Sequence, residues 1–247
     1  MDPYIPNPIQ TQQHNVSKMS SAIKKPDWSP YEMNGGSVMA IAGETFAVIA
    51  SDTRLSEGYS ILSRENPHLY ELEKTNNCIL ACSGFHGDTL TFVKVLQTRL
   101  KSYEHEHNKK TSTNAIAQLI STMLYNKRFF PYYVNPIIAG LDEQGRGAIY
   151  SYDPVGSFDR EIYRSSGSSV ALLQPLLDSQ LGMKNQSEHY EIEKGVTVHQ
   201  SLEKCLQLVK DAFTSAAERD IYTGDAVVIK IITKDGVKTE QFALRRD

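Results

Sequence analysis

Two apolar runs near the start of the chain constrain its fold more than any other feature. Val38–Ala42 and Phe46–Ala50 flank the pair Gly43-Glu44. Short, continuous apolar runs are typical of strands that are buried on both faces, and the intervening pair indicates a hairpin. We therefore predict a hairpin of short strands deep inside a sandwich.

Two charged residues, Asp52 and Arg54, follow the second run. Charges beside a buried strand are costly unless they are paired or hydrogen-bonded. We therefore expect both side chains to have partners that hold this end of the hairpin in place.

Length and composition are those of one globular domain with an appendage. The 247 residues are 40% hydrophobic and carry a formal net charge of −3, which suits a body of about 200 residues and gives no basic surface for nucleic acid. No apolar run approaches the roughly 20 residues that span a bilayer, and the start lacks the order of a signal peptide. We expect a soluble, intracellular protein.

Residues 1–34 are expected to be a polar extension, because they are rich in polar residues and proline and have no period that could bury a face. Residues 35–247 would form the folded domain. Trp28, the only tryptophan, could dock on a partner or on this domain.

Three cysteines, Cys78, Cys82 and Cys205, are an odd number without the spacing of a disulfide scaffold or a zinc site. We expect buried thiols in a reducing compartment.

Blocks of expected strands alternate with blocks of expected helices. Strands are predicted at 69–73, 78–83, 134–142, 146–152, 157–163, 226–233 and 237–244. Helices are predicted from Asp88, from Ser112 or Thr113, at 170–181 despite Pro175, and after a capping box at 197–200. This order favours an α+β fold with antiparallel sheets and outer helices. We predict a four-layer αββα sandwich, two sheets between two helical layers.

Several separated segments resemble the β-type subunits of the 20S proteasome core. They are Gly35–Arg54, Lys127–Val134, Ile138–Asp142, Tyr152–Ser157 and Phe213–Asp220. The resemblance runs from about residue 35 to the C-terminus. The segments are most similar to those of a non-catalytic branch of that family. The resemblance implies the αββα fold of N-terminal-nucleophile hydrolases. We also expect the aromatic residues before Pro131, Phe129 and Phe130, to pack as a corner after a helix end.

In catalytic members of this family, a threonine freed at a Gly-Thr junction is the nucleophile. By the family's spacing, Gly36 fills its place and His68 fills the place of a lysine, while Asp52 matches the aspartate that orients the lysine. Asp220 and Thr223-Gly224 match a supporting loop. Glycine has no hydroxyl, and a histidine of pKa about 6.5 is mostly neutral at pH 7. The resemblance therefore implies no catalytic residue, only vestigial positions.

The resemblance also implies partners and location. They are the other β-subunits of a seven-membered ring, the opposing β-ring, the α-ring and, indirectly, the regulatory particle of ATP- and ubiquitin-dependent protein degradation, in cytoplasm and nucleus. It implies no metal, cofactor, nucleic acid or membrane. Asp153, in a motif like the strand end that completes the specificity pocket of the adjacent chymotrypsin-like subunit, would either line that pocket or be a turn acid.

Alternatives from other classes fit less well. An active amidohydrolase could use Ser37 after cleavage behind Gly36, but the strand register would turn Ser37 to the opposite side. A free-standing binding module lacks a ligand-like constellation. Glu104–His107 reads as a solvated helix end rather than a metal site, and Ser165–Ser169 reads as a helix entry rather than a phosphate loop.

Overall fold

The computed structural model describes residues 29, 31–73, 77–183 and 200–247. Met33–Asp247 form one compact unit, which is described here. Trp28 and residues 197–199 of the expected capping box lie outside the described residues, and the boundary after residue 34 stays a prediction.

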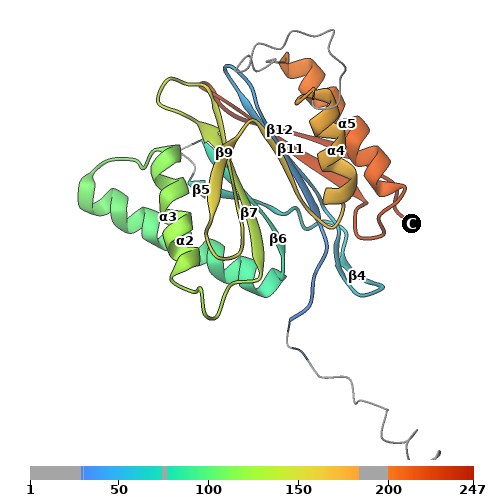
Figure 1. Ribbon diagram of the computed structural model, residues 1–247, viewed down its shortest axis with the longest axis horizontal. Helices are drawn as coiled ribbons and strands as arrows, with labels where there is room; N and C mark the ends of the chain where they lie inside the picture. The colour runs from blue at the N-terminus through green and yellow to red at the C-terminus, as the bar shows by residue number, and fades with distance from the viewer. Residues whose placement is uncertain (1–28, 30, 74–76, 184–199) are drawn as a thin grey trace, which may run out of the picture. The chain divides into compact units, whose positions relative to one another are not determined.

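Two five-stranded antiparallel sheets make up the centre of this unit (Figure 1). The first sheet has the strand order β10-β1-β2-β11-β12 and the second β5-β6-β7-β8-β9. The strands of the first sheet are β1 (Ser37–Ala42), β2 (Ala47–Asp52), β10 (Tyr163–Gly167), β11 (Ala226–Thr233) and β12 (Gly236–Ala243). Those of the second are β5 (Leu69–Glu73), β6 (Cys78–Gly84), β7 (Val134–Leu141), β8 (Gly147–Tyr152) and β9 (Phe158–Glu161). A separate ribbon pairs β3 (Leu55–Glu57) with β4 (Ser60–Ser63).

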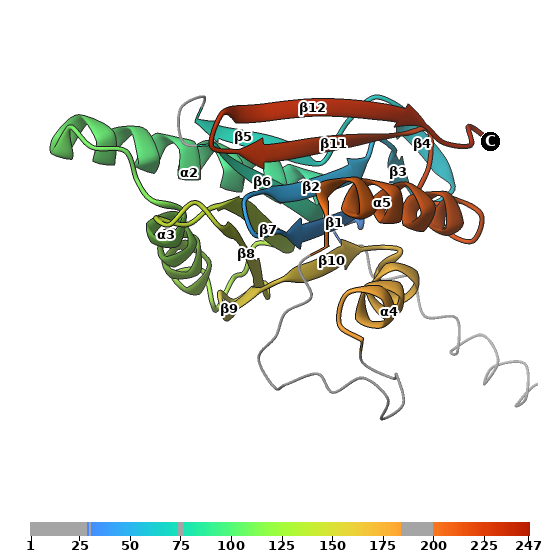
Figure 2. The same cartoon turned by 90° about the horizontal axis from the view of Figure 1, so that it is seen from above.

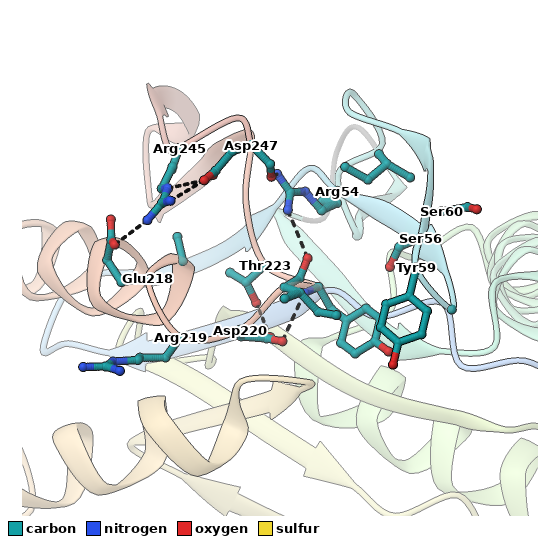
Figure 3. Close-up of a pocket in the computed structure, with 15 residues that line it drawn as sticks. Arg54, Ser56, Tyr59, Ser60, Glu218, Arg219, Asp220, Thr223, Arg245 and Asp247 are labelled. Carbon is teal, nitrogen blue, oxygen red and sulfur yellow. Dashed lines mark hydrogen bonds and ion pairs between the residues drawn. The ribbon is translucent and has the colours of Figure 1, made fainter.

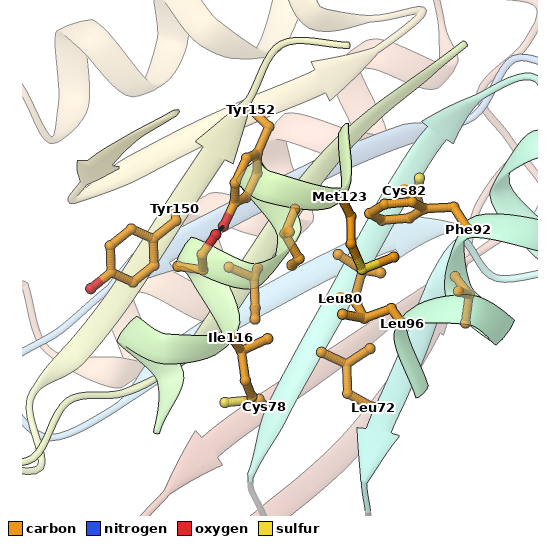
Figure 4. Packing of buried hydrophobic residues seen from close by; sticks show 14 of the residues in the cluster. Leu72, Cys78, Leu80, Cys82, Phe92, Leu96, Ile116, Met123, Tyr150 and Tyr152 are labelled. Carbon is orange, nitrogen blue, oxygen red and sulfur yellow. Dashed lines mark hydrogen bonds between the residues drawn. The ribbon is translucent and has the colours of Figure 1, made fainter. Parts of the chain in front are cut away.

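Four helices cover the outer faces of the sheets (Figures 1 and 2). α2 (His86–His107) and α3 (Thr113–Tyr125) lie on the second sheet, and α4 (Val170–Gln180) and α5 (Leu202–Ala217) lie on the first. One buried cluster fills the space under α2 and α3 (Figure 4), a second fills the space under α4 and α5, and a third lies between the sheets. The predicted four-layer αββα sandwich is confirmed.

The β1–β2 hairpin forms as predicted and is buried on both faces. Because side chains alternate along a strand, Val38 and Ala40 point into the cluster between the sheets, whereas Met39 and Ile41 point into the cluster under α4 and α5. All four residues are at most 2% exposed. Double-sided burial is the physical reason for the continuous apolar run.

The strand predicted at 157–163 is wrong as a single element. It divides into β9, in the second sheet, and β10, in the first, with Ile162 between them. The carbonyl of Ile162 accepts a hydrogen bond from the N–H of Ala42 (2.6 Å), which fixes the crossing point. Ser165–Gly167 consequently belong to β10 and pair with β1, so only Ser168 and Ser169 lead into a helix.

Helix starts also differ from the predictions. α2 begins at His86, two residues before Asp88. α5 begins at Leu202, where Ser201 is the N-cap and its side chain accepts from the N–H of Lys204, which is a simpler cap than the expected box. The ribbon of β3 and β4 was not predicted, because it is short and mostly exposed on β4.

The aromatic corner expected of Phe129 and Phe130 after α3 is wrong. Tyr132 packs edge-on against Phe92, with ring centroids 5.7 Å apart. Phe129 and Phe130, however, are 94% and 71% exposed. The turns that follow α3 direct these two rings away from the core.

The three cysteines are buried and free, as predicted. Among the described helices, none is long and apolar enough to cross a membrane.

Candidate functional site

Gly36, Asp52, His68 and Thr223-Gly224 meet at one end of the first sheet, where β1 begins and β2 ends. Asp52 is fully buried, and its carboxylate accepts hydrogen bonds from the N–H of Ser37 (2.8 Å) and the N–H of Gly224 (3.2 Å). Burial raises the pKa of Asp52 to about 8, although these N–H donors act in the opposite direction. Asp52 therefore ties the starts of β1 and β11 to the end of β2.

His68 lies beside this carboxylate as a neutral side chain. It is 4% exposed, its Nε2 lies 3.1 Å from the carbonyl oxygen of Arg54, and the same nitrogen is 3.9 Å from Oδ1 of Asp52. Burial lowers the pKa of His68 to about 4. A neutral ring that donates from Nε2 to the Arg54 carbonyl satisfies the buried nitrogen, so His68 supplies no permanent positive charge at neutral pH.

The imidazole of His68 fills the space beside Gly36. A Cβ atom at position 36 would lie 2.2 Å from Nε2 and 2.6 Å from Cδ2 of His68. Gly36 also has a φ angle of +81°, which residues with a side chain rarely adopt. A nucleophilic side chain at this position does not fit unless His68 moves and the backbone changes.

Ser37 points away from His68 into a separate group of hydroxyls. The side chain is fully buried, and its Oγ lies 2.6 Å from Oγ of Ser169 and 2.8 Å from Oγ1 of Thr223. The same oxygen accepts from the N–H of Ser169 (3.2 Å). Ser37 therefore has hydroxyl and backbone partners but no base beside it, and it has no exposure to a substrate.

Asp220 extends this hydroxyl group. Its Oδ2 accepts from Oγ of Ser168 and from Oγ1 of Thr223, both at 2.6 Å, and its Oδ1 accepts from the N–H of Tyr222 (3.1 Å). The carboxylate joins the loop before α4 to the loop before β11. Asp220 supports these loops and does not contact Gly36 or His68 in any hydrogen bond.

Arg54 finds a partner that the sequence did not reveal. Its Nε donates to Asp225 (2.8 Å), and Arg64 binds the other oxygen of the same carboxylate. Burial would raise the pKa of Asp225, but the two guanidinium groups outweigh it and lower the pKa. The prediction that Arg54 is paired is confirmed, although its partner is 171 residues away in the sequence and left no local signal.

A cavity of about 430 Å³ lies on the far side of this network (Figure 3). Arg54, Tyr59, Arg219, Asp220 and Arg245 contribute to its wall, together with the end of the chain. Arg54 has further partners, because it also donates to the carbonyls of Ile221 (3.0 Å) and Asp247 (3.1 Å). The buried guanidinium thus holds chain segments together.

Asn34, two residues before Gly36, is held by hydrogen bonds to several segments of the domain and was not singled out by the sequence. Its N–H donates to the carbonyl of Gly84 and its carbonyl accepts from the N–H of Ser56, both at 3.2 Å. Its side chain donates to the Ser56 carbonyl (3.1 Å) and accepts from the N–H of His86 (2.8 Å). Asn34 is 7% exposed, so the residues before Gly36 are bound between two walls of the domain.

Asp153 lies apart from this site, in the exposed turn between β8 and β9. Its Oδ1 accepts from the N–H groups of Val155 (3.1 Å) and Ser157 (2.8 Å). The side chain thus serves as a turn acid within this chain. The carboxylate is also open to solvent on the protein surface, so its expected position in a neighbour's pocket stays a prediction.

Glu104–His107 lie on the exposed end of α2. His107 stacks on Tyr103, with ring centroids 4.2 Å apart, and its Nδ1 lies 3.0 Å from the Tyr103 carbonyl oxygen. Across the described part of the chain, no group of three or more His, Cys, Asp or Glu residues is arranged to hold a metal ion.

Comparison with known proteins is consistent with this geometry. The model of the family described as "Proteasome subunit" matches residues 32–232. The chain is 57% identical to proteasome subunit beta type-1-B of Carassius auratus over 220 residues, which cover 89% of this chain and 90% of the relative. It is 48% identical to beta type-1 of Drosophila melanogaster (91% and 93% covered) and 45% identical to beta type-6 of Saccharomyces cerevisiae (94% and 96% covered).

These names are those of the branch that the segments at 127–134 and 152–157 predicted, the vertebrate beta type-1 and fungal beta type-6 subunits. The matches extend over nearly the full length of this chain and of each relative, and the fold agrees with them. The chain therefore belongs to the proteasome subunit family, in its β-type branch.

Proposed function

We propose that this chain is a non-catalytic structural subunit of the 20S proteasome core, which builds the β-ring and supports protein degradation by active neighbours. One observation carries the proposal. The position of the family's nucleophile is a glycine, and the imidazole of His68 occupies the space that a nucleophilic side chain would need, 2.2 Å from the nearest possible Cβ. An N-terminal nucleophile requires a hydroxyl or thiol there.

Asp52 and Asp220, which match supporting residues of the family's catalytic site, form structural hydrogen bonds in this chain. Asp52 binds backbone N–H groups of Ser37 and Gly224, and Asp220 binds hydroxyls of two loops. The contacts of Asp52 brace the end of the β1–β2 hairpin against the loop before β11, and those of Asp220 join that loop to the loop before α4. The proposal is that Gly36, Asp52, His68 and Asp220 are vestigial catalytic positions that now act in packing.

The burial of Ser37 weighs against the alternative nucleophile. Ser37 has no exposed surface, and its Oγ contacts three hydrogen-bonding groups of Ser169 and Thr223. After cleavage behind Gly36 the freed amine of Ser37 would be the base, but a nucleophile also needs an open approach for the substrate, and the buried Ser37 hydroxyl has none.

As a β-type proteasome subunit, the chain assembles with other subunits of the core particle in rings. The expected neighbours are the flanking β-subunits, the opposing β-ring and the α-ring. Cytoplasm and nucleus are the proposed locations, which fits three free, buried thiols. We propose that the residues before Met33 are an extension outside the ring-building domain, because Asn34 is already bound within that domain.

The test is assembly combined with active-site labelling. A tagged full-length chain that replaces the resident subunit in eukaryotic cells should be recovered in a particle many times heavier than its own 27.7 kDa. A covalent probe for N-terminal threonines should label other subunits in that particle and leave this one unlabelled. Recovery as a stable monomer would contradict the structural role, and labelling of this chain would contradict the absence of catalysis.

A further inference from the structure

The backbone of residues 127–133, which follow α3, is fixed by hydrogen bonds within this chain. The N–H groups of Lys127, Arg128 and Phe130 donate to the carbonyls of Leu124, Tyr125 and Lys127, at 2.9–3.0 Å. The far end is fixed to the start of α2, because the N–H of Tyr133 donates to Asp88 (2.9 Å) and its carbonyl accepts from the N–H of Phe85 (2.8 Å). The segment therefore has a definite shape before any partner binds.

This rigid segment directs aromatic side chains into solvent. Phe129 is 94% exposed, Phe130 is 71% exposed, and Tyr125 at the end of α3 is 62% exposed. We call these three residues the aromatic patch. Large aromatic side chains carry much apolar surface, and adjacent exposed ones mark interaction sites more often than scattered ones do. A fixed backbone lowers the entropic cost of binding, because little has to be ordered.

The patch also carries positive charge. Lys127 and Arg128 are both exposed, and neither forms a salt bridge with any described residue. The guanidinium of Arg128 lies 5.3 Å from the ring centre of Phe129, within the range of a cation–π interaction. A complementary surface would need an apolar hollow for the two rings and carboxylates at its rim.

We infer that the aromatic patch docks into a neighbouring subunit of the core particle, in a hollow rimmed by Asp and Glu side chains. The inference rests on the proposed function, since a subunit of a ring is surrounded by protein surfaces. A lipid surface fits less well, because the patch sits on a tight turn with a satisfied backbone and not on an amphipathic helix of the kind that binds membranes.

The test compares three full-length variants in cells in which each replaces the resident subunit. Phe129→Ser with Phe130→Ser should reduce incorporation into the core particle at least about tenfold in competition with the unaltered chain, because central aromatic residues dominate interface energy. Phe129→Leu with Phe130→Leu should retain most incorporation. Tyr59→Ser, which removes a 96% exposed ring from the β3–β4 ribbon, is the matched control and should assemble normally.

Charge-reversal variants test whether carboxylates of the neighbouring subunit surround the hollow that binds the aromatic patch. Lys127→Glu with Arg128→Glu should slow assembly, with a larger effect at low salt, whereas Lys127→Arg with Arg128→Lys should not. Thermal unfolding of each purified full-length variant should match that of the unaltered chain, because these side chains make few contacts within it.

Four outcomes would be decisive. Normal incorporation of the double serine variant would overturn the inference while leaving the proposed function intact. Binding of the unaltered chain, but not of that variant, to phosphatidylserine vesicles would assign the patch to a membrane instead, and patch-dependent pairing of two copies outside the particle would assign it to self-association. Failure of the unaltered chain to enter any particle would contradict the proposed function itself.

Discussion

At Gly36, the loss of the hydroxyl and the position of His68 are two separate obstacles to activity. Gly36→Thr adds a side chain whose Cβ would meet His68 at 2.2 Å, at a φ angle of +81°. We expect this variant to be destabilised by about 1–3 kcal/mol and to remain inactive, because catalytic groups act as a unit and the lysine position is still His68.

A covalent threonine-directed probe provides the measurement, in particles whose native active sites are blocked by mutation. Gly36→Thr with His68→Lys should be labelled more than Gly36→Thr alone, since the ring is removed and a cation is supplied. Equally strong labelling of the single and double variants would show that only the nucleophile was missing.

The buried histidine also predicts a pH dependence of stability. The pKa of His68 is lowered to about 4 in the folded chain, so between about pH 6.5 and 4 the unfolded chain binds more protons at this residue. The His68 contribution is therefore fully present above pH 6.5 and is lost as pH falls through this window.

Chemical denaturation of the unaltered chain and of His68→Gln at pH 7 and pH 5 tests this. The unaltered chain should lose more stability on acidification than the variant does. Asp52, whose raised pKa has the opposite sign, and His86, whose pKa burial lowers, remain in both proteins. Both interact with His68, so the comparison reports His68 together with its coupling to these two groups. His105→Gln, at the exposed helix end, is the control and should leave the difference unchanged.

Asp153 yields a prediction about a neighbour's specificity. If its carboxylate lines the adjacent chymotrypsin-like pocket, Asp153→Ala should change cleavage of peptides that differ at the third residue before the scissile bond. The other two proteolytic activities of the particle should not change. Equal effects on all three activities would indicate that the turn held by Val155 and Ser157 matters for assembly instead.

Among the elements, the segment that ends at Gly35 is predicted to survive self-processing. Peptide-bond rearrangement needs a hydroxyl after the junction, and Gly36 offers none. The hydrogen bonds of Asn34 to Ser56, Gly84 and His86 also hold the junction within the domain. N-terminal sequencing of the chain, assembled beside catalytically inactive neighbours, should find residues upstream of Gly35. A uniform start at Gly36 in that background would refute the prediction.

The carboxylate of Asp225, which lies just before β11, pairs with the guanidinium of Arg54, which lies just after β2. Asp225→Asn removes the charge that neutralises Arg54, which is only 4% exposed, and should destabilise the domain by about 3–5 kcal/mol. Thermal or chemical unfolding is the measurement. Glu240→Gln, which breaks an exposed pair with Lys238, should change stability by less than about 1 kcal/mol. Comparable losses in both variants would show that burial of the pair is unimportant.

Sequence patterns predicted the elements that are long or buried on both faces and missed features that depend on distant partners. The β1–β2 hairpin was predictable because both faces of each strand contact a core. The change of sheet at Ile162 was not, because alternation continues through the crossing while the hydrogen-bond partners change. Asp225 could not be identified as the partner of Arg54, because the two residues are far apart in the sequence. The exposure of Phe129 could not be predicted either, because it depends on the direction of a turn.

On the scale of the whole molecule, the sequence resemblance placed the site more completely than periodicity could. It brought Asp52, His68 and Gly36 together from separate segments, and the structure has them adjacent. The resemblance did not show how much space there is for a side chain at position 36. The clash between such a side chain and the His68 ring follows only from the three-dimensional packing.

The first sheet has a consequence for synthesis of the chain on the ribosome. Its central strand, β2, pairs with β1 at once but with β11 only after residue 233 has been made, and the Arg54–Asp225 pair closes over 171 residues. At ~5–20 residues per second this delay is on the order of ten seconds or more. The second sheet with α2 and α3 is encoded continuously between Leu69 and Glu161. It can therefore form co-translationally and cover the face of the β1–β2 hairpin that carries Val38 and Ala40. The face that carries Met39 and Ile41 awaits a chaperone or the later helices and strands.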